Sequence, residues 1–240
     1  MKLSKETVNI LNNIAKINTN FFIEKDSSSI KTMNHQGTVF CAAGIEETFP
    51  VDVGIYDLQE FLSIAQLQGN ASLVELDLSD KKCVLSFDSG YSCEYWYASK
   101  EVLKVPENMI KMPPSVVEFV LESDVITTLR NAAQKLSKPS IAFTTSTTDP
   151  SKVVAKVFDP QNASGNVFSK TIELAADLDC SFDFVFNLQN LKYLMENEDY
   201  AVKFAAKGKA KISSFATLDS SIYDLTYYLG LDSSSTLNGE

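Results

Sequence analysis

Four segments of the chain repeat apolar residues at helical spacing, which predicts four amphipathic helices. In the first segment, the apolar positions of one face are Leu3, Thr7, Ile10, Leu11, Ile14 and Ile17. The second helix is expected to end near Gly69, and Pro139 forbids continuation of the third. Short polar residues before each apolar run are suitable N-caps. The predicted N-caps are Ser4, Asp57, Ser123 and Asn187.

Most of the remaining chain has the composition of β-strands. Apolar and polar residues alternate, or β-branched and aromatic residues cluster, in several short runs. These runs are residues 49–55, 72–78, 152–158, 200–204 and 222–228. A few short helices among many strands indicate the α+β class.

The order of helix, strands, helix and strands occurs twice. Three residues of the first helix recur in the third at an offset of 118 positions, with Leu11, Asn13 and Ala15 matching Leu129, Asn131 and Ala133. Residues 55–59 likewise match residues 185–189 at an offset of 130. An internal repeat of this kind indicates a unit used twice. We therefore predict two similar domains, 1–110 and 111–240, joined through a proline-punctuated segment.

Composition places the chain among ordinary globular proteins. Of its 240 residues, 45% are hydrophobic and 22% are charged, and no run reaches the length needed to cross a bilayer. The amino terminus lacks the apolar core of a secretion signal, so we expect a cytosolic protein. The four cysteines have no Cys-x-x-Cys spacing, and we expect reduced, buried thiols at Cys41, Cys83, Cys93 and Cys180.

The charge balance restricts how the protein could bind nucleic acid. A net charge of −10 argues against a uniformly basic, phosphate-binding surface. Arg130 is the single arginine among 21 basic residues, and the others are lysines. Because base-specific readout relies on bidentate arginine, sequence-specific DNA recognition is not favoured.

Motifs that carry catalysis are missing from the sequence. The single histidine, His35, lies in the polar run Met33–Gly37, which is typical of an exposed turn. There is no phosphate-binding glycine loop, dinucleotide fingerprint or nucleophile elbow. Acidic pairs occur at 46–47 and 177–179, so a two-carboxylate hydrolase stays open as the weakest alternative. We expect no catalytic residue, cofactor or metal site.

Several stretches resemble one known family. The opening Met1-Lys2-Leu3-Ser4-Lys5, residues 51–58 with Phe61-Leu62, and residues 206–209 are similar to the trimeric sliding clamps of T-even-like bacteriophages, which are DNA polymerase processivity factors. The resemblance covers nearly the whole chain. It implies the DNA-clamp fold, in which each of two domains packs two short helices on antiparallel sheets. It also implies a head-to-tail homotrimeric ring closed through edge strands.

The resemblance implies a function without catalysis. A clamp encircles duplex DNA without sequence specificity and tethers the phage replicative polymerase, in the cytoplasm of the infected bacterial host. Its further expected partners are an ATP-driven clamp loader and late-transcription factors. A negative exterior is compatible with this function if basic residues line the inner wall.

The helices of the two halves carry the basic residues that the resemblance places toward DNA. These expected inner-wall residues are Lys2, Lys5, Lys16, Arg130, Lys135, Lys138 and Lys192. Lys207, Lys209 and Lys211, around Gly208, are candidate DNA contacts on a turn. The second helix carries Asp57 and Glu60, so we do not expect a uniformly basic bore.

Clamps bind apolar peptide tails of their partners beside the segment that joins the domains. The resemblance therefore suggests a partner groove at Val105, Met109, Ile110 and Met112, although these residues could also belong to the core. The serine-rich acidic tail, about 232–240, is expected to be disordered. The main alternative function is that of a structural or adaptor β-rich virion protein, which would not encircle DNA.

Overall fold

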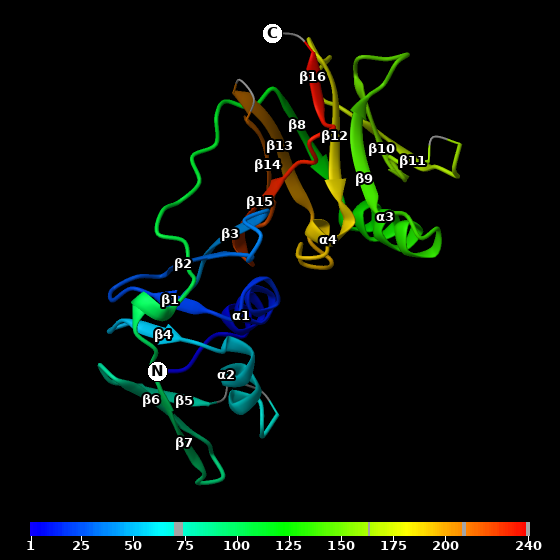
Figure 1. Cartoon of the computed structure of the whole chain (residues 1–240). Coiled ribbons are helices and arrows are strands. Elements are labelled where there is room, and N and C mark those ends of the chain that lie inside the picture. The colour runs from blue at the N-terminus through cyan, green and yellow to red at the C-terminus, as the bar shows by residue number, and fades with distance from the viewer. Residues whose placement is uncertain (70–73, 163, 208–209, 239–240) are drawn as a thin grey trace. The chain divides into compact units, whose positions relative to one another are not determined.

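The computed structural model describes residues 1–69, 74–162, 164–207 and 210–238 (Figure 1). Its internal contacts divide the chain into two units. Unit 1 contains Met1–Met109 and Asp219–Thr226, and unit 2 contains Ile110–Leu218 and Tyr227–Glu240. The predicted domains 1–110 and 111–240 thus differ from these units at Ile110, which belongs to unit 2, and in Asp219–Thr226, which returns to unit 1. The prediction placed that segment in the second domain because it lies in the second half of the sequence.

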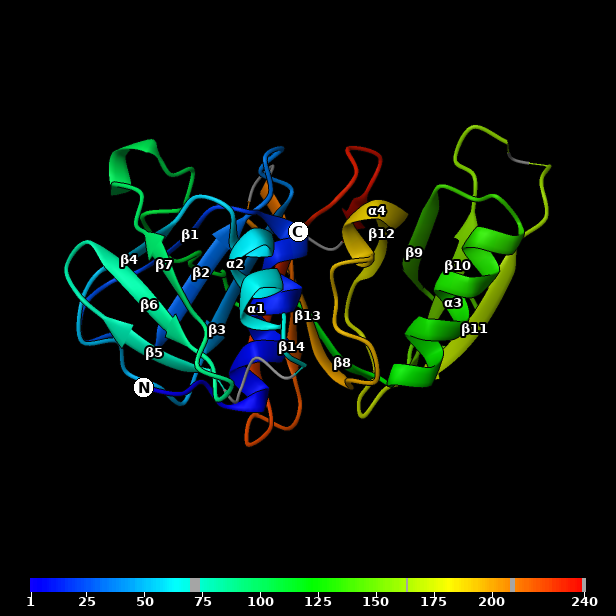
Figure 2. The ribbon, with the colours of Figure 1, turned by 90° about the horizontal axis from the view of Figure 1, so that it is seen from below.

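Unit 1 consists of two helices and small antiparallel sheets. Its elements are α1 (Lys5–Ile17), β1 (Phe21–Ile23), β2 (Ser29–Met33), β3 (Val39–Gly44), β4 (Val53–Ile55), α2 (Leu58–Ala65), β5 (Glu75–Leu78), β6 (Lys82–Ser86), β7 (Ser92–Trp96) and a 3-10 turn (Lys100–Val102). Strand β1 pairs with β4, β2 pairs with β3, and β5, β6 and β7 form a three-stranded sheet. Helices α1 and α2 lie side by side (Figure 2).

Unit 2 repeats the order of helix, strands and helix. Its elements are β8 (Val117–Leu121), α3 (Ser123–Lys135), β9 (Ser140–Thr145), β10 (Lys152–Phe158), β11 (Phe168–Glu173), β12 (Ser181–Asn187), α4 (Leu188–Leu191), β13 (Tyr200–Lys207), β14 (Ala210–Thr217) and β16 (Thr236–Asn238). Strand β15 (Asp224–Gly230) begins in the segment assigned to unit 1 and continues into unit 2 from Tyr227. One sheet has the order β11-β10-β9-β12-β16, and β13 pairs with both β8 and β14. Helix α3 lies against β9, β10 and β11 (Figure 2).

The predicted repetition is visible in the helices. Helices α1 and α3 have 13 residues each, and they start and end at the same offset of 118 positions. Helices α2 and α4 begin at Leu58 and Leu188, at the offset of 130 positions found in the sequence. Helix α2 ends at Ala65, earlier than the predicted end near Gly69, and α4 is a single turn.

Three of the four predicted N-caps are confirmed. The side chains of Ser4, Asp57 and Asn187 accept hydrogen bonds from the first-turn amides of α1, α2 and α4. The predicted cap Ser123 is wrong, because Ser123 is the first residue of α3 itself. Its amide donates to the carboxylate of Asp199, 2.7 Å away, so a residue far along the chain satisfies this helix end.

Each unit has its own apolar core. In unit 1, Ile14, Ile30, Ile55 and Leu58 are fully buried. Unit 2 is built around aromatic rings, and Phe204 lies at their centre with Phe184 at a ring distance of 4.8 Å in an edge-to-face arrangement. This packing fixes the sheets from which the surface residues below project.

The carboxy-terminal segment is ordered through Asn238, which corrects the predicted disordered tail. Strand β16 pairs with β12, and the amide of Asp232 donates to the carbonyl of Val185 at 2.8 Å. The buried Ser235 hydroxyl accepts from the Val185 amide at 2.9 Å. The serine-rich composition of the tail therefore did not predict its specific hydrogen bonds to residues far away in the sequence. Residues 239–240 lie outside the described part.

Other predictions have mixed outcomes. His35 is exposed between β2 and β3, as predicted. All four cysteines are free, but only Cys41 and Cys83 are buried. Cys93 and Cys180 are half-buried, because Cys93 lies on the edge strand β7 and Cys180 precedes the first residue of β12.

Candidate nucleic-acid interface and partner groove

Helix α1 presents one polar stripe of basic and amide side chains. Lys5 and Lys16 are 11 residues apart, so at about 100° and 1.5 Å per residue they lie on the same side, about 16 Å apart along the axis. Asn9 and Asn12 lie between them on that side. Both lysines are exposed, and Lys2 is exposed just before the helix. Exposed ammonium groups on one side of a helix form a surface that attracts phosphate groups.

The asparagines of this stripe are oriented by neighbouring residues of unit 1. Asn9 Nδ2 donates to the Tyr223 hydroxyl at 2.9 Å, and Asn12 Nδ2 donates to the carbonyl of Val8 at 2.9 Å. The start of α1 is held by Glu47, whose carboxylate accepts from the Ser4 amide and from the Thr7 hydroxyl. The basic stripe is thus carried on a firmly anchored helix.

Helix α2 contributes a different surface. Its exposed Glu60 lies near its N-terminus, and Tyr95 Oη lies 3.3 Å from the Glu60 carboxylate. Gln59 Nε2 donates to the carbonyl of Ala15, which ties α2 to α1. The two helices of unit 1 are therefore unequal in charge.

Arg130 is engaged with main-chain carbonyls at the end of α4. Its Nη2 donates to the carbonyl of Leu191 and, at 3.2 Å, to that of Leu194. Burial lowers the pKa of its guanidinium from the ordinary value. Because Nη2 donates to two main-chain carbonyls and the guanidinium is largely removed from solvent, we assign Arg130 a structural role and leave it out of the DNA-facing set proposed below.

The other predicted basic residues of unit 2 are placed in different ways. Lys135 is exposed on α3, and Lys192 is exposed with its ammonium 3.0 Å from Gln189 Oε1. Lys138 is half-buried and reaches toward Gly165, where an added Cβ would lie 2.8 Å from its Nζ. The exposed cations of unit 2 are thus more dispersed than those of α1.

The predicted basic turn is only partly described. Lys209 and the side chain of Lys207 lie outside the described residues. Lys211 is half-buried, and its ammonium donates to the carbonyl of Ser235. This contact holds the carboxy-terminal segment, so Lys211 has a structural partner.

Two of the four predicted groove residues line a cavity in unit 1. Val105 and Met109 form part of a cavity of about 170 Å³ together with Phe22 and Pro106. Ile110 and Met112 do not line it; both are half-buried and follow it along the chain. The sequence pattern missed Phe22, which projects from β1 and gave no signal beyond its apolar character.

Charged residues surround this cavity. Lys100 Nζ lies 2.9 Å from Glu24 Oε1 and 4.8 Å from the centre of the Phe22 ring. The hydrogen bond and the positive charge of Lys100 lower the pKa of Glu24. Lys31 donates to the carbonyl of Glu107. The cavity is therefore lined by the apolar side chains of Phe22, Val105, Pro106 and Met109 together with two serines, two lysines and one glutamate.

Buried asparagines after α1 position the segment that lines the cavity. Asn18 Nδ2 donates to the carbonyl of Lys104 at 2.7 Å, and Asn20 Oδ1 accepts from the Lys104 amide at 2.9 Å. Asn20 Nδ2 also donates to the carbonyl of Tyr56 at 2.7 Å. These bonds fix the path of the chain immediately before Val105.

Comparison with known proteins identifies the family. The model of a family described as DNA polymerase processivity factor matches residues 4–94. The sliding clamp of Vibrio phage KVP40 is 30% identical over 211 residues, which cover 87% of this chain and 92% of that protein. The chain belongs to the phage sliding clamp family. The resemblance read from the sequence is thereby confirmed.

Further relatives support the clamp fold. The sliding clamp of Escherichia phage RB69 is 27% identical over 239 residues, covering 98% of this chain and 99% of the relative. A structure of A. fulgidus PCNA with the C-terminal region of FEN-1 has a TM-score of 0.69 at 13% identity, covering 96% of each chain. The predicted fold class is confirmed, and the virion alternative is not favoured.

No three histidine, cysteine or acidic side chains in the described part of the chain gather as a metal site would require. None of the helices found there has the length and apolarity needed to traverse a lipid bilayer.

Proposed function

We propose that this sliding clamp encircles duplex DNA and tethers the phage replicative DNA polymerase, and that it confers processivity without catalysing a reaction. Membership of the family carries the proposal, and the basic stripe of α1 is the observation on this chain that supports it. The protein would act in the cytoplasm of the infected bacterial host. An ATP-driven clamp loader would supply the energy for ring opening.

The proposed assembly is a head-to-tail homotrimer in which units 1 and 2 are the two clamp domains. Two similar units in each of three copies give a pseudo-sixfold ring, and a heterologous contact closes when the rotation between copies is right. Light scattering at high protein concentration tests this assembly. A monomer under all conditions would contradict it.

Lysines of the helices and their flanks form the proposed DNA-facing set. It consists of Lys2, Lys5 and Lys16 in unit 1 and Lys135, Lys138 and Lys192 in unit 2, with α1 carrying the most continuous stripe. A lysine ammonium attracts phosphate as a point charge without fixing one position, which suits a protein that slides. Because the ring itself retains the DNA, these contacts need only be weak.

A primer-extension assay on circular DNA, with the cognate loader and polymerase, tests this set. The Lys5→Glu, Lys16→Glu double variant should shorten the products several-fold and reduce the salt dependence of clamp retention, since each lost phosphate contact lowers the slope by about 0.9. A Lys25→Glu, Lys111→Glu variant makes the same charge change elsewhere. Wild-type product lengths with unchanged salt dependence would remove α1 from the DNA-facing surface.

The cavity lined by Val105 and Met109 is the proposed docking site for an apolar side chain of a partner's peptide tail. Its volume of about 170 Å³ suits one such side chain. In the similar structure of A. fulgidus PCNA, the C-terminal region of FEN-1 is bound to that protein. We propose the polymerase as the main occupant here, with the loader and late-transcription factors as competitors. Val105→Glu should weaken clamp-dependent synthesis while the oligomer persists.

A further inference from the structure

Lys31 is a half-buried cation in the lining of the unit 1 cavity described above. Its neighbours on β2, Ile30 and Thr32, are buried, so the strand alternation turns Lys31 to the opposite side. Ser29 lies on that side too and lines the same cavity. The sequence thus places an ammonium group beside a hydroxyl at the edge of an apolar pocket.

The charge of Lys31 is not neutralised by any described residue. Its ammonium donates to the main-chain carbonyl of Glu107, which is a neutral acceptor. No carboxylate of the residues that the structure describes lies within ion-pair distance of it. Because an ammonium group has three donors, Lys31 can keep this bond and still bind an incoming anion.

Lys100, the second cation of the cavity, already has a partner. Its ammonium lies 2.9 Å from Glu24 Oε1. The hydrogen bond and the negative charge of Glu24 raise the pKa of Lys100, and the carboxylates of Asp52 and Glu107 add to this effect. An incoming carboxylate would have to compete with Glu24 for Lys100, whereas Lys31 is available to it.

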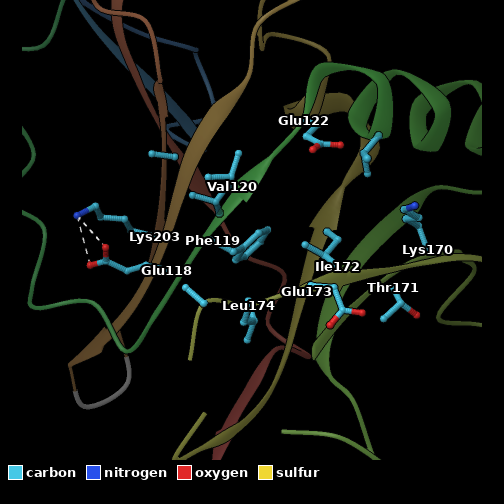
Figure 3. A pocket seen from close by; sticks show the side chains of 14 residues that line it. Glu118, Phe119, Val120, Glu122, Lys170, Thr171, Ile172, Glu173, Leu174 and Lys203 are labelled. Atoms are coloured by element: carbon cyan, nitrogen blue, oxygen red, sulfur yellow. Dashed lines mark hydrogen bonds and ion pairs between the residues drawn. The ribbon is translucent and has the colours of Figure 1, made fainter. Parts of the chain in front are cut away.

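Unit 2 contains a larger cavity whose charge balance is the opposite (Figure 3). Its volume is about 570 Å³, its lining includes three glutamates and two lysines, and Lys203 lies 3.2 Å from Glu118. The lining of the unit 1 cavity includes two lysines and one glutamate. A carboxylate is therefore attracted by the charges of the unit 1 cavity and repelled by those of the unit 2 cavity.

We propose that the partner tail that docks in the unit 1 cavity carries an aspartate or glutamate beside its apolar anchor, and that Lys31 binds this carboxylate. An apolar pocket alone accepts any tail with a side chain of suitable size, whereas a charged group in its lining discriminates among such tails. Glu24 opposes the same tails, because it is paired with Lys100 and repels carboxylates. The inference rests on the docking site proposed above and specifies the chemistry of its occupant.

Calorimetric titration of the full-length clamp with two peptides tests the role of Lys31. The first peptide is the carboxy-terminal tail of the cognate polymerase. The second has every aspartate and glutamate of that tail replaced by asparagine and glutamine. Both keep the terminal carboxylate, so the ratio of their dissociation constants reports on the acidic side chains. The wild-type clamp should bind the acidic peptide about fivefold more tightly than the amide peptide.

Three variants of the clamp assign this preference to particular residues. Lys31→Gln should reduce the preference to less than about twofold, since glutamine can still donate to the Glu107 carbonyl but has no charge. Glu24→Gln removes the competing carboxylate and should increase the preference about threefold. Lys203→Gln removes the same charge as Lys31→Gln from the cavity of unit 2, and it should leave the preference unchanged.

The outcomes separate the inference from the docking site on which it rests. Equal binding of the two peptides to the wild-type clamp overturns the inference, and so does a preference that survives Lys31→Gln or decreases in Glu24→Gln. A preference lost in Lys203→Gln would move the acidic tail to unit 2. If neither peptide binds, or if Val105→Glu leaves both affinities unchanged, the proposed docking site itself is wrong. Circular dichroism checks that each variant is folded.

Discussion

The role of Arg130 can be decided by replacing it with lysine or alanine. In the structure, its Nη2 donates to the carbonyl of Leu191, the last residue of α4, and to that of Leu194, which follows the helix. Lysine keeps the positive charge but lacks the planar guanidinium whose Nη2 donates to both carbonyls. A structural role therefore predicts that both variants are less stable. A DNA-facing role predicts that the lysine variant behaves as wild type.

The expected loss of stability follows from the two hydrogen bonds. A hydrogen bond to a charged group contributes about 1.5–3 kcal/mol, and the two bonds share one side chain, so their sum is not additive. We expect Arg130→Ala to lower the free energy of unfolding by about 3 kcal/mol. For a chain of this size, that corresponds to a fall in the melting temperature of about 6–12 °C.

Thermal unfolding by circular dichroism measures this effect at one fixed protein concentration, because the stability of an oligomer depends on concentration. Lys135→Ala, on the same helix but exposed, should change the free energy of unfolding by less than about 0.5 kcal/mol. If Arg130→Lys melts with wild type while Arg130→Ala loses polymerase stimulation without loss of stability, the structural assignment is refuted and Arg130 returns to the DNA-facing surface.

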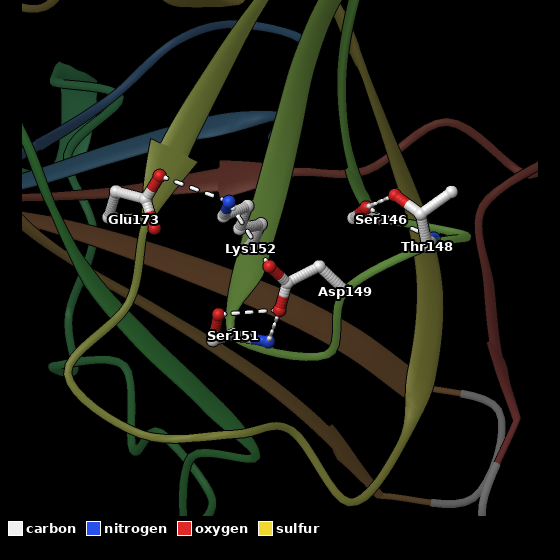
Figure 4. Close-up of polar contacts among 6 residues, drawn as sticks. All are labelled: Ser146, Thr148, Asp149, Ser151, Lys152 and Glu173. Atoms are coloured by element: carbon white, nitrogen blue, oxygen red, sulfur yellow. Dashed lines mark hydrogen bonds and ion pairs between the residues drawn. The ribbon is translucent and has the colours of Figure 1, made fainter.

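Three further predictions concern stability and titration. Replacing Glu47 with alanine removes the acceptor of the Ser4 amide and the Thr7 hydroxyl, and should cost about 1 kcal/mol by denaturant titration, whereas a cost of zero would mean that water replaces the carboxylate. Phe204→Ala should cost about 3–5 kcal/mol, since Phe204 is fully buried among aromatic rings; a loss below about 1 kcal/mol would mean that the core collapses into the space. Hydrogen bonds from Ser151 and Lys152 lower the pKa of Asp149 to about 2 (Figure 4), so its stabilising effect is present above about pH 4 and is lost as the pH falls toward 2. Carboxyl NMR titration checks this, and an ordinary midpoint would contradict it.

Local signals in the sequence were sufficient for the helices. Ser4, Asp57 and Asn187 cap helices through amides two or three residues away, so their roles can be read from adjacent residues. The prediction of the α3 N-cap failed because the acceptor of the Ser123 amide is the side chain of Asp199, 76 residues further along the chain. The same limit explains Arg130, which has a polar position on α3 but finds its acceptors at the end of α4.

The candidate site was predictable to a similar extent. Helical periodicity was enough to place Lys5 and Lys16 on one side of α1. The lining of the groove could not be predicted in this way, because Phe22, on a strand early in the chain, lines the same cavity as Val105 and Met109. The composition of the tail suggested disorder. In the structure, a hydrogen bond from the Val185 amide to the Ser235 hydroxyl, 50 residues further along the chain, holds the tail in place. Contacts between residues so far apart in the sequence produce no periodic pattern of apolar and polar positions from which they could be predicted.

The return of Asp219–Thr226 to unit 1 affects the order in which a newly made chain can fold. The Tyr223 hydroxyl accepts a hydrogen bond from Asn9 Nδ2 of α1. Helix α1, the first helix to leave the ribosome, therefore lacks this partner until almost the entire chain has been translated. Domains usually fold as they emerge, amino-terminal first. In this clamp the amino-terminal unit is completed late, because its last segment, Asp219–Thr226, is translated only after residues 110–218 of unit 2.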